Sequence, residues 1–223
     1  MSKIKAILFD LDNTLIDFMK MKKEATRSAM KAMIKAGLKV NEAEGYKKLF
    51  ITYIRLGIES QNAFQEYLKS EIGRIDEKML AAAINAYLKT KNNFLKPYAS
   101  VKPTLKELKK RKIKLWVVTD APKIKAYQRL LAMNIEKYFD LVIGFEDTGK
   151  KKKTEIPFNT ALEKLGLDKK EVMTIGDSLK RDIIPTKKVG LVSAWAKYGT
   201  LEKIGKIKPD FELNEFSDIL KLI

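Results

Sequence analysis

A nearly continuous apolar run at residues 4–10 leads into two aspartates, Asp10 and Asp12, at the end of what we expect to be a buried strand. Such a run is typical of a parallel sheet that is covered on both faces. Two carboxylates placed two positions apart repel each other, so they need a positive group between them. The end of this strand is therefore a candidate site as well as part of a candidate core.

Two different patterns follow this strand. Over residues 17–94, apolar residues recur at helical spacing, which predicts about four helices with breaks near residues 37, 57–60 and 73–76. Their expected inner faces include Met30, Leu49, Ile54, Ile72 and Leu88. After residue 96, strands and helices alternate. Strands are predicted at residues 113–119, 139–143, 172–175, 191–195 and 211–213, and helices at 101–111, 122–133, 157–165, 179–188, near 201–204 and from 216 onward.

Strands separated by helices imply right-handed crossovers and a parallel sheet whose site lies at the carboxyl ends of the strands. We therefore predict an α/β protein with helices on both faces of a parallel sheet. Its core domain is expected to comprise residues 1–16 and 95–223, with an inserted all-helical domain at residues 17–94.

Composition limits the chemistry that the chain can perform. Its 223 residues, 45% of them hydrophobic, can bury a substantial core. The chain has neither cysteine nor histidine, which excludes thiolate sites and removes the commonest general base. Chemistry must use carboxylates, lysines, hydroxyls, backbone amides or a hard metal bound through oxygen. No apolar run approaches the roughly 20 residues that cross a bilayer, so we expect a cytoplasmic protein with no membrane partner.

The net charge of +17 admits two interpretations. One is an anionic partner, either a nucleic acid or a phosphorylated small molecule. The other is a solvated lysine surface, and we favour it because lysines are scattered through every segment and no arginine-rich stripe with aromatics appears. Of the 45 basic residues, only six are arginines: Arg27, Arg55, Arg74, Arg111, Arg129 and Arg181. Nucleic acid is therefore not the expected partner.

Polar residues follow three of the predicted strands and become neighbours in this architecture. Four carboxylates, Asp10, Asp12, Asp177 and Asp182, converge on one edge of the sheet. Their convergence is costly unless a cation is bound. Because the available ligands are all oxygens, Mg²⁺ is the expected metal.

These residues resemble a known family. Four segments resemble, in order, the four motifs of the haloacid dehalogenase-like (HAD) superfamily. They are DLDNT at residues 10–14, Thr119, a lysine before PFNTAL, and GDSLKRD at residues 176–182. The resemblance covers nearly the whole chain. The helical insertion is similar to the C1 cap domain of subfamily I, and KPYASVKPTLKEL at residues 96–108 resembles the return to the core. The resemblance to this superfamily implies a Rossmann-like core domain that carries a helical cap.

The resemblance implies a division of roles among the carboxylates. Asp10 would attack the phosphorus of a phosphate ester and form an aspartyl-phosphate. Asp12 would protonate the leaving oxygen and later deprotonate the hydrolytic water. Mg²⁺ would be held by Asp10, the backbone carbonyl of Asp12 and Asp177, and Asp182 would orient the metal shell.

The remaining candidate residues have alternatives. Thr119 is expected to donate to phosphate oxygens, although its hydroxyl could instead cap the following helix. Thr14 is expected either at the phosphate or in the turn after the strand, and Asp120, which departs from the family's usual asparagine or glycine, either at the substrate or as a helix cap. The third motif lacks its usual proline in KKKKTEIPFNTAL. We expect Lys153 to be the catalytic lysine, with Lys152 as the alternative.

The leading functional hypothesis is a magnesium-dependent phosphatase that hydrolyses a small phosphorylated metabolite, as a monomer or a homodimer. A phosphomutase of the β-phosphoglucomutase type uses the same carboxylate pair and is one alternative. The other is a non-catalytic protein of the same fold that binds anions or nucleic acid.

Overall fold

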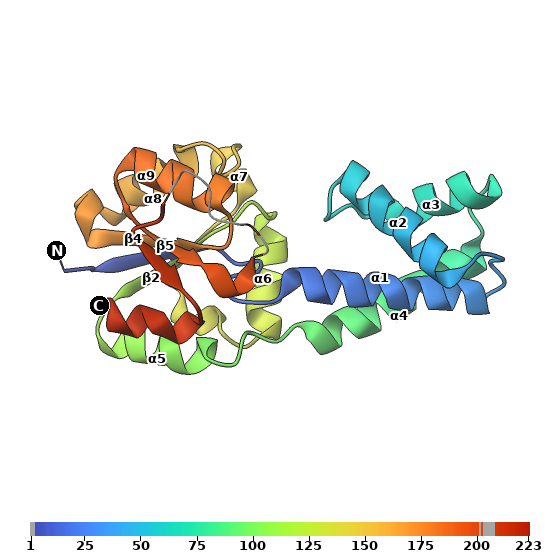
Figure 1. Ribbon diagram of the computed structural model, residues 1–223, viewed down its shortest axis with the longest axis horizontal. Coiled ribbons are helices and arrows are strands. Elements are labelled where there is room, and N and C mark those ends of the chain that lie inside the picture. The colour runs from blue at the N-terminus through green and yellow to red at the C-terminus, as the bar shows by residue number, and fades with distance from the viewer. Residues whose placement is uncertain (1–2, 201, 203–207) are drawn as a thin grey trace. The chain divides into compact units, whose positions relative to one another are not determined.

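The computed structural model describes residues 3–200, 202 and 208–223 (Figure 1). The chain divides into two compact units, one formed by Met1–Asp17 and Lys96–Ile223 and the other by Phe18–Leu95. These bounds differ by one residue from the expected limits of the insertion.

The first unit is built on a parallel sheet. In the described part of the chain, six strands lie in the order β3-β2-β1-β4-β5-β6, and every neighbouring pair is parallel. The strands are β1 (Ala6–Phe9), β2 (Lys114–Val118), β3 (Leu141–Ile143), β4 (Val172–Gly176), β5 (Val192–Ala196) and β6 (Phe211–Leu213). The central strand β1 pairs Ala6 with Lys114 on one side and with Val172 on the other. The predicted α/β class and parallel sheet are confirmed.

Helices and short helical turns connect the strands. They are α5 (Val101–Lys110), α6 (Lys123–Ala132), η1 (Glu136–Tyr138), α7 (Phe145–Thr148), α8 (Ile156–Leu165), η2 (Lys169–Glu171), η3 (Leu179–Ile183), α9 (Ile184–Val189), η4 (Lys197–Gly199) and η5 (Phe216–Lys221). Helices α8 and α9 lie on one face of the sheet, and α5 and η5 on the other (Figure 1). Both faces are therefore covered, as the continuous apolar strands require.

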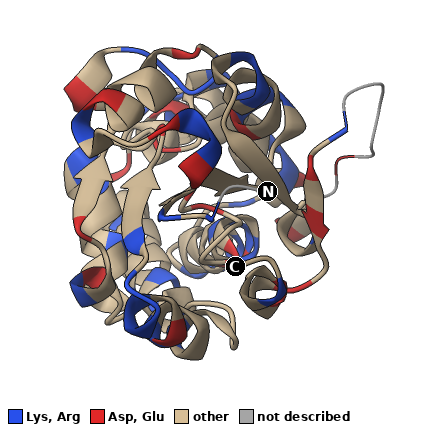
Figure 2. Cartoon of the chain, turned by 90° about the vertical axis from the view of Figure 1, so that its left-hand side faces the viewer, with Lys and Arg blue, Asp and Glu red and all other residues tan. Residues whose placement is uncertain are grey.

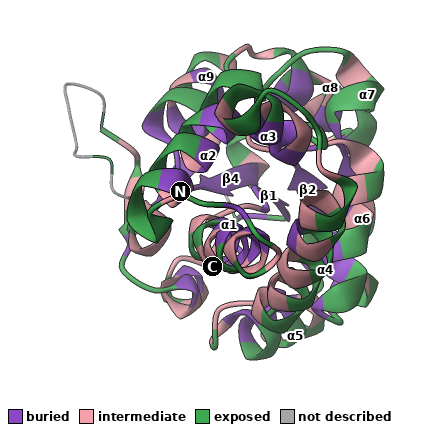
Figure 3. Ribbon diagram, turned by 90° about the vertical axis from the view of Figure 1, so that its right-hand side faces the viewer, coloured by how far each residue is buried: buried purple, intermediate pink, exposed green. Residues whose placement is uncertain are grey.

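Alternate residues of β1 serve the two faces of the sheet. Ala6 and Leu8 belong to a buried cluster that includes Phe158 of α8. On the other face, the ring of Phe9 lies 5.6 Å from that of Phe216, measured between centroids. Strands β1, β2 and β4 are drawn as buried in Figure 3. This buried framework fixes the positions of the loops that follow the strands.

The second unit contains α1 (Phe18–Lys35), α2 (Glu42–Leu56), α3 (Ala63–Ile72) and α4 (Glu77–Phe94). Asn41 caps α2, because its side chain accepts from the amides of Ala43 and Glu44. The unit has its own core, whose fully buried residues include Met30, Leu49, Tyr67 and Leu68. The periodicity wrongly placed three apolar residues inside: Ile54, Ile72 and Leu88 are 62%, 37% and 46% exposed.

The chain enters and leaves this insertion side by side in the first unit. Ile16 forms a β-bridge with Pro97, and the amide of Tyr98 donates to the carbonyl of Leu15 at 3.0 Å. Both crossings are therefore held by backbone contacts of the core. No helix in the portions that the structure describes has the length and apolar character needed to cross a membrane.

Two of the expected helices differ from the structure, and a third lies mostly outside the described residues. The predicted helix at residues 179–188 is divided into the π-helical turn η3 and the α-helix α9. The terminal helix from residue 216 is a 3-10 helix. The predicted short helix near residues 201–204 lies outside the described residues, except for Glu202.

Figure 2 shows one side of the chain, on which basic residues are widely distributed. Lysines and arginines are spread over many helices and loops rather than gathered in one stripe (Figure 2). This distribution agrees with the expected solvated lysine surface.

Candidate active site

The candidate site lies at the carboxyl ends of the strands and includes the turn that follows β1. Asp10 is 5% exposed and its amide donates to the carbonyl of Ile175 in the neighbouring strand at 2.8 Å. Asn13 adopts a positive φ of 61°, which asparagine tolerates better than most residues, and its amide donates to Ile16. A Cβ on Gly199 would lie 1.6 Å from the Asn13 carbonyl oxygen, so only glycine fits against this turn.

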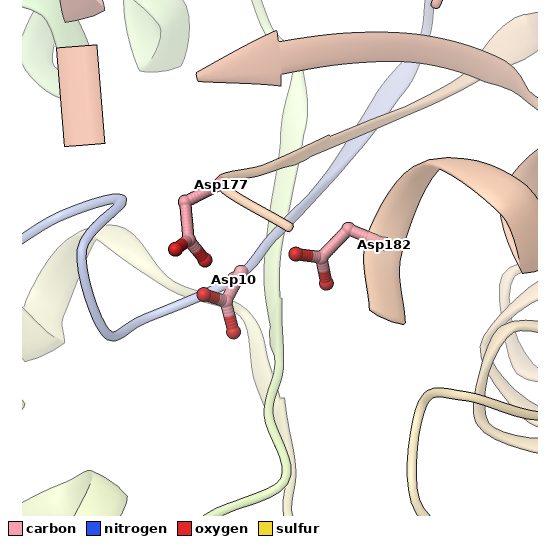
Figure 4. Close-up of side chains that lie close together, drawn as sticks. All are labelled: Asp10, Asp177 and Asp182. Carbon is pink, nitrogen blue, oxygen red and sulfur yellow. The ribbon is translucent and has the colours of Figure 1, made fainter. Parts of the chain in front are cut away.

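Three aspartates from distant segments meet at this edge. Asp10 follows β1, Asp177 follows β4, and Asp182 lies in η3. Each offers one carboxylate oxygen, and these oxygens all lie within 4.8 Å of one another. The three side chains point toward one another (Figure 4). Of the four carboxylates expected to converge, Asp10, Asp177 and Asp182 form this group, and Asp12 is not part of it.

Hydrogen bonds hold the carboxylate of Asp182 and the backbone of Asp177 in place. The amide of Ser178 donates to Asp182 Oδ2 at 3.0 Å. Trp195 Nε1 donates to the carbonyl of Asp177 at 2.8 Å, which ties the end of β4 to β5. A Cβ on Gly176 would lie 2.2 Å from Asp182 Cγ, so this glycine allows Asp182 to approach the strand end.

One buried lysine joins this cluster, and it is Lys152. Its side chain is 2% exposed, and its Nζ donates to Asp10 and to Asp182, the latter at 2.6 Å. Lys153 is exposed, so its expected position at the site is corrected by the structure. The reason lies in the backbone: the amide of Lys152 donates to Asp120 Oδ1 at 2.7 Å, which turns its side chain inward and that of its neighbour outward.

The other predicted residues also lie at this edge. The Thr119 hydroxyl accepts from the amide of Ala121 at 3.2 Å, as a capping hydroxyl does, but it also has a proton to donate. Thr14 is fully buried and its hydroxyl donates to Asp10 Oδ2 at 3.4 Å. It therefore contacts the aspartate that follows β1. Asp120, expected at the substrate or as a cap, accepts from the backbone amide of Lys152.

The cluster carries more negative charge than its protein cations neutralise. Burial, together with the charges of Asp10 and Asp182, raises the pKa of Asp177 to about 8. Burial also raises the pKa of Asp182. Burial alone would lower the pKa of Lys152, but the charges of Asp10 and Asp182 raise it above its ordinary value. The lysine is therefore charged, and Asp177 is held in an environment that disfavours its ionised form.

Sequence reasoning did not assign several side chains at this edge, among them Arg129 and Asn13. Arg129 Nη1 donates to Asp12 Oδ2 at 2.9 Å, and Asn13 Nδ2 donates to Asp177 Oδ2 at 3.4 Å. Asn13 lies inside the DLDNT motif and could have been inferred from it. Arg129 lies in the middle of a predicted helix, where no motif marks it.

Comparisons with known proteins identify the family of the chain. Residues 7–196 match the family model of haloacid dehalogenase-like hydrolases. The chain is 33% identical to the glyceraldehyde 3-phosphate phosphatase of Methanopyrus kandleri over 99% of this chain and 97% of the relative. It is 31% identical to the phosphoglycolate phosphatase of Aquifex aeolicus, with 99% and 97% covered.

A solved structure shows the same fold. The HAD-hydrolase YfnB from Bacillus subtilis, bound to magnesium, matches with a TM-score of 0.73 and 19% identity, covering 99% of each chain. The family match spans most of this chain and includes all four motifs. The chain therefore belongs to the haloacid dehalogenase-like hydrolases and is a phosphatase.

Proposed function

We propose that this phosphatase requires magnesium and hydrolyses small phosphomonoesters, with glyceraldehyde 3-phosphate as its substrate. The observation that carries the proposal is the buried Asp10, Asp177 and Asp182 cluster with Lys152 beside it. The full-length likeness to the glyceraldehyde 3-phosphate phosphatase of Methanopyrus kandleri supports the choice of substrate.

The chemistry of the cluster fits Mg²⁺. Its ligand atoms are carboxylate oxygens, which hard divalent cations prefer. The raised pKa of Asp177 supports the same ion, because it reflects negative charge that a divalent cation would neutralise. Asp10, Asp177 and Asp182 would hold the metal, and the backbone carbonyl of Asp12 remains a proposed ligand. When bound, the ion would offset the repulsion between the Asp10 carboxylate and the phosphate group.

In the proposed reaction, an Asp10 oxygen attacks phosphorus and forms a P–O bond, while the bond from phosphorus to the leaving oxygen breaks. Asp12 gives its proton to that oxygen, which leaves as an alcohol. Asp12 then takes a proton from water as the water attacks the aspartyl-phosphate, which releases phosphate and regenerates Asp10. The positive charge of Lys152 and the hydroxyl proton of Thr119 would stabilise the oxygens of the transferring phosphoryl group.

Phosphate release tests the proposal. The purified protein is assayed with glyceraldehyde 3-phosphate and phosphoglycolate, each with Mg²⁺ and with EDTA. We expect Mg²⁺-dependent release that is faster with glyceraldehyde 3-phosphate and is lost in Asp10→Asn. Release by Asp10→Asn at the parent rate would contradict the nucleophile assignment, and a preference for phosphoglycolate would contradict the proposed substrate.

The phosphomutase alternative gives a different product. When β-glucose 1-phosphate is supplied with a catalytic amount of the bisphosphate, a mutase moves the phosphoryl group to another hydroxyl without releasing it. We expect no such isomer. If the isomer formed without release of inorganic phosphate, the protein would be a phosphomutase and the proposal of hydrolysis would be wrong.

A further inference from the structure

Arg129 is buried on the inner face of α6. All six arginines of the chain lie in the described residues, and Arg129 is the one whose exposed fraction falls to 3%. Its buried neighbours on the helix, Ala126 and Leu130, form the spacing expected of an apolar face. A guanidinium at such a position loses its hydration and needs an ionic partner.

Asp12, 117 positions away in the sequence, is an ionic partner of Arg129. Arg129 Nη1 donates to Asp12 Oδ2 at 2.9 Å. The Arg129 side chain is 4% exposed, whereas that of Asp12 is 23% exposed. Asp12 is therefore the more accessible member of the pair.

The two aspartates of the DLD sequence are held by different cations. Lys152 donates to Asp10 and Asp182, while Arg129 donates to Asp12. The guanidinium of arginine is a planar fork, whereas an ammonium is a point charge that rotates freely. The hydrogen bond from Arg129 Nη1 can therefore hold Oδ2 of Asp12 in place as well as offset its charge.

We propose that Arg129 is a positioning residue for the phosphatase reaction, which orients the Asp12 carboxylate toward the leaving oxygen. This inference rests on the proposed function, because it concerns the acid role of Asp12 in ester cleavage. Proton transfer requires close and aligned atoms, so a misdirected Asp12 would slow cleavage of esters whose leaving group needs protonation. An ester with an acidic leaving group depends much less on that proton.

The test compares a series of phosphomonoesters from nitrophenyl phosphate, with an acidic leaving group, to an alkyl phosphate, with a weakly acidic one. The quantity measured is kcat/KM, because it reports the steps up to ester cleavage and not the later attack of water. We expect Arg129→Met to lower kcat/KM about 100-fold for the alkyl ester and less than about threefold for nitrophenyl phosphate. Arg129→Lys should recover part of the loss. Lys125→Met, which removes a cation from the same helix, should leave both values within about twofold of the parent.

A double-mutant cycle then asks whether Arg129 acts through Asp12. In an Asp12→Asn background, Arg129→Met should change alkyl-ester kcat/KM by less than about threefold, because the positioned group is already absent. If Arg129→Met fails to fold in the parent, the cycle is run with Arg129→Lys. An equal loss for all esters, no loss, or an undiminished loss in the Asp12→Asn background would overturn the inference. Absence of Mg²⁺-dependent hydrolysis by the parent would instead overturn the proposed function.

Discussion

Substitution of Lys152 measures how much its positive charge stabilises the carboxylates of the cluster when no metal is bound. We consider the substitution Lys152→Met, which keeps a long apolar side chain and removes the charge. Asp10 and Asp182 are 5% and 1% exposed, and they would lose the cation that they share. Removing one partner from a buried ion pair costs about 3–5 kcal/mol.

Proton uptake sets an upper limit on this loss. Instead of remaining charged without a cation, one carboxyl of the cluster takes up a proton. For an aspartate with an unperturbed pKa of about 3.9, this costs about 4 kcal/mol at pH 7 and about 1.5 kcal/mol at pH 5. The destabilisation by Lys152→Met should therefore be at most about 4 kcal/mol at pH 7 and at most about 1.5 kcal/mol at pH 5.

Urea unfolding in EDTA, at both pH values, measures these free energies. Lys153→Met is the matched control, because it removes the same charge from an exposed neighbour and should change the free energy of unfolding by less than about 0.5 kcal/mol. The reasoning would be refuted if the two variants unfolded at the same urea concentration at pH 7, or if the loss caused by Lys152→Met did not shrink at pH 5.

Two further predictions concern the same cluster. Gly176→Ala should weaken Mg²⁺ binding at least about tenfold, measured by calorimetry, because its Cβ would displace Asp182, a proposed ligand; parent-like affinity would contradict this. The pKa of Asp177 is raised to about 8 in the folded chain, from about 3.9 in the unfolded chain, so the folded state binds more protons between these values. The melting temperature in EDTA should therefore fall as pH rises from 4 to 8, and Mg²⁺ should reduce that fall; identical pH profiles with and without Mg²⁺ would argue against it.

The sheet could be read from the sequence because buried parallel strands are short apolar runs. Strand β4, for example, is predicted at residues 172–175 and is Val172–Gly176, with all five residues buried. The division of the helix at residues 179–188 was not predictable in this way. In η3 the amide of Ile183 donates to Ser178, an i to i+5 bond that periodicity does not reveal, and such turns are frequent at functional sites.

The carboxylates of the site were also readable, because motif order and strand ends place them. The cations were not. A run of four lysines carries no pattern that says which one points inward, and the choice of Lys152 depends on a hydrogen bond to Asp120 that forms only in the folded chain. Arg129 lies on an inner helical face where periodicity predicts an apolar residue.

The contacts between Ile16 and Pro97 and between Leu15 and Tyr98 bear on how such a protein can change. These backbone contacts hold the two ends of the insertion next to each other in the core unit. Any helical module whose ends come equally close could be fitted there while the chain on the core side stays in register. Variation in the insertion and preservation of the phosphate chemistry can therefore proceed separately.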